Sequence, residues 1–174
     1  IVKKDAETGK IIPAAGIGFK VRNTDTGNFV VQHITYPTPA DIDTYYTDLT
    51  GKLMLPEKLP YGNYEITEQC TAYGYVLNAE PVAFKIDGSK TVVTVEKRNM
   101  PQKGIIRIQK NGEVFASVNK SDGVYQPVFA NKGLAGAVYE ITAAEDIITP
   151  DGTLRYAKGT AADTVTTDKK GNAE

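Results

Sequence analysis

The sequence has little of what disulfide, membrane or hydrolytic chemistry requires. Among 174 residues there is one cysteine, Cys70, which excludes an internal disulfide. No apolar run approaches the length of a membrane span. The only histidine, His33, has no serine or cysteine near it in the sequence, which argues against a hydrolase. The net charge of −1 is spread over mixed signs, so the whole chain has no pronounced attraction to nucleic acid or an anionic membrane.

Strand signals dominate what is present. Short runs rich in Val, Ile, Thr and Tyr alternate with Gly, Pro, Asn and Asp, and no window of helical length keeps a 3.6-residue period. The sequence therefore predicts an all-β chain built of β-sandwiches. The predicted strands are GFKVRN, GNFVVQHI, GKLMLP, GNYEITE, PVAFKI, KTVVTVE, GIIRIQ, GAVYEITA, GTLRYA and DTVTTD.

An internal repeat divides the chain. The stretch AGIGFKV, residues 15–21, returns as AGAVYEI, residues 135–141, and an apolar strand ending in lysine precedes each copy. The junction NMPQKG predicts two domains, 1–101 and 102–174. The second copy contains an insertion, EVFASVNKSDGVYQPVFANKG, and stops where the first would have three more strands. We therefore expect a C-terminally truncated second sandwich that belongs to a longer array.

A carboxylate shares the apolar face of one predicted strand. Tyr64, Ile66 and Glu68 have the same parity, so a strand that buries the first two residues also buries the third. A buried charge needs a partner, which makes lysines and amides on other core-facing strands relevant.

Lysine and asparagine are the candidate partners. Lys110 shares a face with two isoleucines in the second copy, and aligning Lys110-Asn-Gly with Lys3-Lys-Asp selects Lys3 in the first copy. Asn99 has the parity of two preceding valines, whereas Lys97 breaks the apolar pattern unless a bulge intervenes. Taken singly, a lysine at a strand end usually reaches water, and an asparagine before proline usually caps a turn.

Several motifs in order carry a resemblance. They are Lys3-x-Asp at the start, Ala-Gly-x-x-Phe, Tyr64-x-x-x-Glu followed by Gly-Tyr, and a closing Asn99-x-Pro-x-x-Gly. The set resembles the Cna protein B-type domain, and more narrowly the SpaA-like prealbumin-fold, Ig-like repeats of Gram-positive surface proteins and pilins. The resemblance covers residues 1–99 and restarts at 104. One departure is that the loop between Glu68 and Gly74 lacks the proline that relatives often have there. Its absence loosens the turn, but the glutamate is present.

The resemblance implies a covalent chemistry. It implies that Lys3 attacks the side-chain carbonyl of Asn99, that Glu68 acts as the catalytic acid, and that a Lys–Asn isopeptide bond results. This is a single-turnover self-modification rather than enzymatic turnover, and it needs no cofactor or metal. By the same resemblance Lys110 is the candidate isopeptide lysine of the second copy, although this chain lacks the strands that would hold its partners.

The resemblance also implies a place and partners. It implies a stalk or spacer module of a protein attached to the cell wall on the extracellular surface of a Gram-positive bacterium. The implied partners are neighbouring domains of the same surface protein, and peptidoglycan through a sorting signal outside this chain.

An adhesive role is the alternative. Residues 32–48 are rich in tyrosine and proline, so Tyr36, Tyr45 and Tyr46 form a candidate binding face for a host extracellular protein or glycan. An edge strand with an ordered loop is the favoured explanation of this segment. The acidic stretches NTDTGN and DIDTYYTD lack the spaced ligand set of a calcium loop, so no metal site is expected.

Overall fold

The computed structural model describes residues 1–174, and every regular element in it is a strand. The all-β prediction is therefore confirmed. The chain divides into two compact units. Unit 1 comprises Ile1–Gln102 with Thr149–Thr153, and unit 2 comprises Lys103–Ile148 with Leu154–Glu174.

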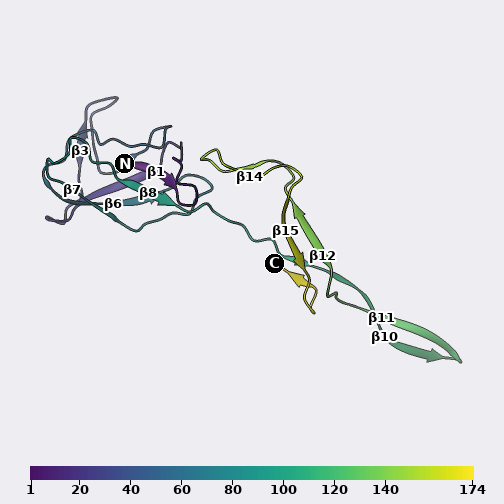
Figure 1. Ribbon diagram of the computed structural model, residues 1–174. Helices are drawn as coiled ribbons and strands as arrows, with labels where there is room; N and C mark the ends of the chain where they lie inside the picture. Colours follow the sequence, from purple (N-terminus) through teal and green to yellow (C-terminus); the bar gives the residue numbers. More distant parts are fainter. The chain divides into compact units, whose positions relative to one another are not determined.

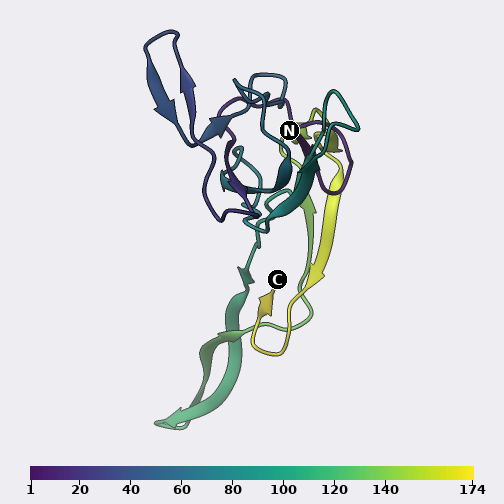
Figure 2. The same cartoon turned by 90° about the vertical axis from the view of Figure 1, so that its left-hand side faces the viewer.

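Unit 1 has two layers that bring its first and last strands together. An antiparallel four-stranded sheet has the order β5-β2-β6-β7, and a parallel pair joins β1 to β8. Figure 1 shows β1 and β8 side by side, and the hairpin β3–β4 (blue in Figure 2) extends from the unit. The strands are β1 (Val2–Asp5), β2 (Gly18–Asn23), β3 (Gln32–Ile34), β4 (Ala40–Ile42), β5 (Tyr45–Tyr46), β6 (Gly62–Cys70), β7 (Val82–Ile86) and β8 (Glu96–Asn99).

The core of unit 1 follows the alternation of its strands. In β6 the buried residues are Tyr64, Ile66 and Glu68, and the residues between them are only half-buried. Phe19 and Val21 of β2 face the same core. The apolar core consists of Ile12, Ile17, Phe19, Val21, Tyr45, Tyr64, Ile66, Tyr75 and Val95.

Two predicted strands of unit 1 are wrong or largely so. GKLMLP forms only an isolated bridge, from Lys52 to Val2, and the proline at its end has no N–H to donate to a ladder. In KTVVTVE only Glu96 is in a strand; Val95 meets β1 by accepting a hydrogen bond at 2.8 Å from the Val2 N–H. The β1–β8 ladder therefore starts later than the apolar run suggests.

Unit 2 consists of paired strands without a large apolar core. Its pairs are β9–β16, β10–β11, β12–β15 and β13–β14. Within residues 103–174 only Ala143, Thr167 and Gly171 are buried. The second sandwich therefore stays a prediction. The strands are β9 (Ile108–Gln109), β10 (Asn111–Ser121), β11 (Val124–Gly133), β12 (Val138–Thr142), β13 (Ile147–Ile148), β14 (Leu154–Tyr156), β15 (Ala161–Thr166) and β16 (Asn172–Ala173).

The predicted insertion forms a ribbon of its own. Strands β10 and β11 pair only with each other, over almost their whole length, and the ribbon projects from the rest of unit 2 (green in Figures 1 and 2). Phe115 and Phe129 lie opposite each other on it with ring centroids 6.3 Å apart, and both remain more than half exposed.

A threonine organises the start of the sheet in each unit. The Thr47 main-chain N–H donates to the Ile17 carbonyl at 3.0 Å, and its hydroxyl donates to the Ala14 carbonyl at 2.7 Å. The hydroxyl also accepts from the Ile17 N–H at 3.1 Å, and the Thr47 carbonyl accepts from the Gly16 N–H at 3.0 Å. Thr167 makes the same four hydrogen bonds with the same spacing, to Leu134, Gly136 and Ala137.

Two lysines share a backbone environment as well. The Lys3 N–H donates to the Gly51 carbonyl at 3.0 Å, and the Lys110 N–H donates to the Gly171 carbonyl at 2.7 Å. The Lys3 carbonyl accepts the Ile12 N–H at 3.0 Å and the Lys110 carbonyl accepts the Leu134 N–H at 2.9 Å, although these two donors occupy positions two residues apart in the repeat. This recurrence of one hydrogen-bond frame supports the predicted repeat and its alignment of Lys3 with Lys110.

Candidate functional site

Three polar side chains from distant parts of the sequence meet inside unit 1. Lys3 lies on β1, Glu68 on β6 and Asn99 on β8, and their exposed fractions are 0%, 1% and 1%. These are the three residues that the sequence singled out for the first copy. Each is inward because its strand alternates: β1 and β8 each bury every second residue, so Lys4 and Arg98 point outward.

The strand register sets the distance between lysine and asparagine. In the parallel β1–β8 ladder Lys3 lies opposite Lys97 and Asp5 lies opposite Asn99, so Lys3 and Asn99 are diagonal neighbours on one face. The long lysine side chain spans that diagonal. Glu68 reaches the same point from the other layer, where it lies opposite Phe19 of β2.

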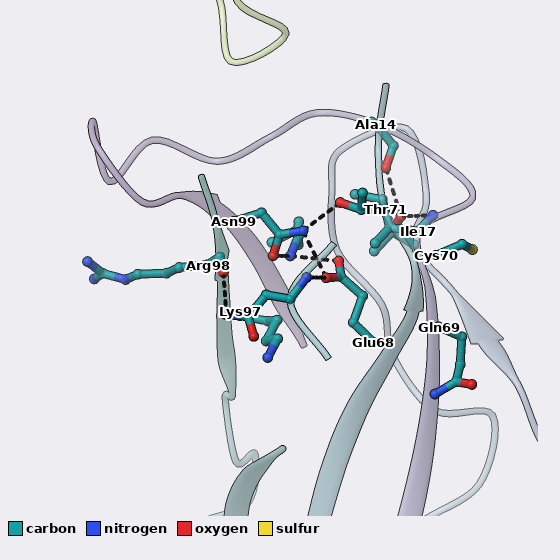
Figure 3. A network of polar contacts seen from close by, with 12 residues as sticks. Ala14, Ile17, Glu68, Gln69, Cys70, Thr71, Lys97, Arg98 and Asn99 are labelled. Carbon is teal, nitrogen blue, oxygen red and sulfur yellow. Dashed lines mark hydrogen bonds and ion pairs between the residues drawn. The ribbon is translucent and has the colours of Figure 1, made fainter. Parts of the chain in front are cut away.

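The three side chains form a closed ring of contacts. Lys3 Nζ donates to Asn99 Oδ1 and lies 2.7 Å from Glu68 Oε1. Asn99 Nδ2 donates to Glu68 Oε2 at 2.8 Å and to Thr71 Oγ1 at 2.6 Å. Figure 3 shows Glu68, Thr71 and Asn99 joined in this network while Arg98 points away from it. Glu68 therefore touches both nitrogens that an amide exchange would involve.

Glu68 has one further hydrogen-bond partner, and its second carboxylate oxygen contacts Lys3. Its Oε2 also accepts the main-chain N–H of Asn78 at 3.0 Å. Its Oε1 is buried and accepts no hydrogen bond of regular geometry, and Lys3 Nζ is its polar neighbour. At 2.7 Å the two groups are close enough to exchange a proton.

The electrostatics of the site favour a neutral lysine. Burial lowers the pKa of Lys3, the hydrogen bond and charge of Glu68 raise it, and the charge of Lys97 lowers it again. The net direction is downward. A neutral amine is the nucleophilic form of lysine, so the environment moves Lys3 towards reactivity.

Lys97 is a buried residue that the sequence interpretation did not place. The sequence interpretation treated Lys97 as a break in the apolar pattern unless a bulge intervenes, but β8 runs regularly and Lys97 is only 2% exposed. Its Nζ donates to the main-chain carbonyl of Glu80, which gives the amine a partner and removes the need for a bulge. Lys97 shares its strand parity with Val95 and Asn99, and this pattern indicates that its side chain faces the core.

Thr71 is a second residue that was missed. It follows the end of β6, and its hydroxyl receives the Asn99 amide. No sequence pattern marks it, because its role depends on where the chain turns after Cys70.

Lys4 and Lys110 lie outside such a site. Lys4 is paired with Glu96 on the outer face of the β1–β8 ladder. Lys110 is exposed between β9 and β10, although its main chain repeats the hydrogen bonds of Lys3. Its role as an isopeptide lysine stays a prediction.

The candidate tyrosine face is only partly exposed. Tyr36 is 85% exposed and Tyr46 57%, but Tyr45 is 2% exposed. The Tyr45 hydroxyl donates to the Val30 carbonyl at 3.1 Å inside unit 1, and burial, with the nearby Asp43 and Glu57, raises its pKa to about 12. The inclusion of Tyr45 in a binding face is therefore wrong, because β5 turns it into the core.

Neither a metal cluster nor a spanning helix is found. No group of three or more His, Cys, Asp or Glu side chains comes together in a way that could hold a metal ion. The structure contains no helix of the length and apolarity needed to cross a membrane.

The fold and the site define a class, an all-β prealbumin-like module with a buried lysine, glutamate and asparagine. Residues 1–101 match the SpaA family, described as a prealbumin-like fold domain. The match covers more than half of the chain, so the chain belongs to this family.

Two solved structures are similar over nearly the whole chain. The Bacillus anthracis TIE protein is 21% identical with a TM-score of 0.49, over 99% of this chain and 25% of that one. A streptococcal ancillary pilin is 20% identical with a TM-score of 0.42, over 98% of this chain and 46% of that one. The chain thus spans less than half the length of either protein. A comparison with curated proteins finds no significant match.

Proposed function

We propose that unit 1 closes an isopeptide bond between Lys3 and Asn99, and that the chain is a structural module of a Gram-positive surface protein or pilin. The observation that carries the proposal is the buried ring of contacts among Lys3, Glu68 and Asn99. Burying each of these polar groups costs free energy, so their meeting inside the core supports a chemical role.

The proposed reaction needs only these three side chains. Neutral Lys3 Nζ attacks Asn99 Cγ, and Glu68 accepts a proton from the attacking nitrogen and returns one to Nδ2, which it already contacts. The Nζ–Cγ bond forms, the Cγ–Nδ2 bond breaks, and Nδ2 leaves as ammonia. Lys3 Nζ keeps one hydrogen in the new amide.

The role of Glu68 in this scheme is proton transfer. The catalytic acid that the family resemblance implies both polarises the Asn99 carbonyl and shuttles protons, and polarising the carbonyl requires the amide to be turned so that Oδ1 faces the Glu68 carboxyl. In the orientation described, Oδ1 faces Lys3 and Glu68 lies between the two nitrogens. Each chain reacts once with itself, so the chemistry is not enzymatic turnover.

An intact mass of the purified chain tests the proposal. We expect a mass lower than the sequence mass by one ammonia, and a cross-linked peptide that joins the segments around Lys3 and Asn99. Glu68→Ala and Lys3→Met should each restore the full mass. Lys4→Met is the matched control, because Lys4 is the next residue of β1 but faces outward, and its chain should still lose ammonia. A full mass in the unaltered chain contradicts the proposal.

A surface location and structural role agree with family membership and with the lack of internal disulfides. A lysine–asparagine cross-link replaces the covalent support that disulfides supply in many secreted domains. Neighbouring domains of the same protein are the proposed partners. The adhesive alternative now depends on Tyr36 and Tyr46, which remain exposed. To test it, the unaltered chain and a variant with both residues changed to serine are compared for binding to an array of glycans and matrix proteins.

A further inference from the structure

Lys97 is a second buried lysine beside the proposed reaction centre. It is the residue across the β1–β8 ladder from Lys3, it faces the same core, and it lies two residues before Asn99. Its amine meets the main-chain carbonyl of Glu80 rather than a carboxylate. A buried ammonium with a neutral partner keeps its electrostatic effect on the groups around it.

Two positive charges lie side by side while both lysines are protonated. Lys3 and Lys97 are partners across the β1–β8 ladder and face the same core, and Glu68 contacts only Lys3 at ion-pair distance. Asp5 supplies a second buried carboxylate at the end of β1, where the Tyr75 hydroxyl donates to it at 2.9 Å and main-chain N–H groups also donate to it. Two neighbouring buried ammonium groups repel each other, and release of one proton removes that repulsion.

Lys3 is the lysine placed to release that proton. The Glu80 carbonyl holds the Lys97 ammonium by accepting from it. The proton that Lys3 releases goes to solvent, because transfer to Glu68 would leave the net charge of the core unchanged and would occupy the base that the reaction needs. Burial and the charge of Lys97 lower the pKa of Lys3, against the hydrogen bond and charge of Glu68. Burial also lowers the pKa of Lys97, against the charges of Glu68 and Glu80, so the net direction is downward for both lysines.

We propose that Lys97 is a positioning residue whose buried ammonium displaces the proton of Lys3 and lets the cross-link form at neutral pH. The proposal rests on the isopeptide function proposed above. It assigns Lys97 no contact with the reacting carbonyl, and its action is purely electrostatic.

The test needs a full chain that has not yet reacted, and Cys70 supplies a way to make it. Residues 1–69 carrying a C-terminal thioester can be joined to residues 70–174 through the Cys70 thiol in strong denaturant, where the site cannot assemble. Dilution into buffers of different pH starts folding, and the loss of one ammonia is followed by mass against time. Folding is followed in parallel by circular dichroism.

Three chains are compared, with Lys97 unaltered, Lys97→Met and Lys97→Arg. Methionine keeps the length and removes the charge, whereas arginine keeps a charge that does not titrate. We expect the Met chain to react about tenfold more slowly at neutral pH, with a pH–rate midpoint moved upwards, because the rate follows the neutral fraction of Lys3. The Arg chain should keep the low midpoint. At high pH, where Lys97 itself loses its proton, the unaltered and Met chains should converge.

The outcomes separate the two proposals. If the unaltered chain folds and loses no ammonia at any pH, the isopeptide function is wrong and the role of Lys97 falls with it. If the unaltered chain reacts and the Met chain has the same midpoint, or is slowed equally at every pH, the isopeptide function stands and the electrostatic role is wrong. If the Met chain does not fold, the Arg chain decides, because an upward shift of its midpoint overturns the proposal.

Discussion

The strongest quantitative prediction concerns removal of the cross-link together with the charges of Lys3 and Glu68. Lys3→Met together with Glu68→Gln replaces both charged members of the site by neutral side chains of similar length. No bond can form, and neither variant residue leaves an unpaired ion in a core where both positions are almost fully buried. The double variant therefore isolates the contribution of the covalent link.

The magnitude follows from the positions of the linked strands. A bond from Lys3 to Asn99 closes nearly the whole of unit 1, and a loop of roughly 100 residues gives about 4.7 kcal/mol in the chain-entropy treatment used for disulfides. For a unit of this size about 1 kcal/mol corresponds to about 4–8 °C in Tm. We therefore expect the double variant to melt about 20–40 °C below the cross-linked chain.

The assay is calorimetry or near-ultraviolet circular dichroism, which reports on the three core tyrosines Tyr45, Tyr64 and Tyr75. Lys4→Met with Glu96→Gln is the matched control. This pair also joins β1 to β8, but it lies on the exposed face, and exposed ion pairs contribute only about 0–1 kcal/mol. If the control and the double variant lose similar stability while the mass proves the bond in the parent, the loop-closure reasoning is refuted.

Three further predictions follow from individual contacts. In Asn99→Ala no bond can form, and Lys3 stays a titrating amine whose pKa is lowered in the folded state. Because the unfolded state then binds more protons, thermal stability should rise with pH up to the ordinary lysine pKa. Adding Lys3→Met should reduce that dependence of stability on pH. Tyr45→Phe should cost about 1 kcal/mol in urea unfolding through the lost hydrogen bond to Val30, and Tyr46→Phe should cost almost nothing. Hydrogen exchange should be fast throughout β10–β11 and slow in β6, since the ribbon has no covering layer; equal protection would contradict this.

The sequence predicted well which side chains of the candidate site are buried where strands are regular. Because β6 alternates without a bulge, the parity of Tyr64 and Ile66 correctly put Glu68 inside. Lys97 was misjudged because a charge on an apolar face was treated as a break in the pattern, whereas the Glu80 carbonyl, from a separate loop, satisfies its amine. Contacts with main-chain groups of loops depend on tertiary structure, and no local pattern encodes them.

The fold shows the same division between local and distant information. The alternation of apolar residues located β2, β6 and β7 closely. It could not show that GKLMLP stays outside the ladders, since Val, Leu and Met runs fit strands and covered loops alike. The segment after Lys110 was interpreted as an insertion, and its β10–β11 pairing was not predicted, because polar and apolar residues occur on both of its faces.

The parallel pairing of β1 with β8 has a consequence for quality control during folding. These strands are the first and last of unit 1, so the lysine and the asparagine meet only after the two ends of the unit have come together, and Glu68 reaches them from the other layer. Under the proposal made above, the loss of ammonia is not reversed by later unfolding, because the leaving group diffuses away. A molecule that lacks one ammonia has then folded correctly at least once, and the molecules of full mass in a preparation are those that have not reacted.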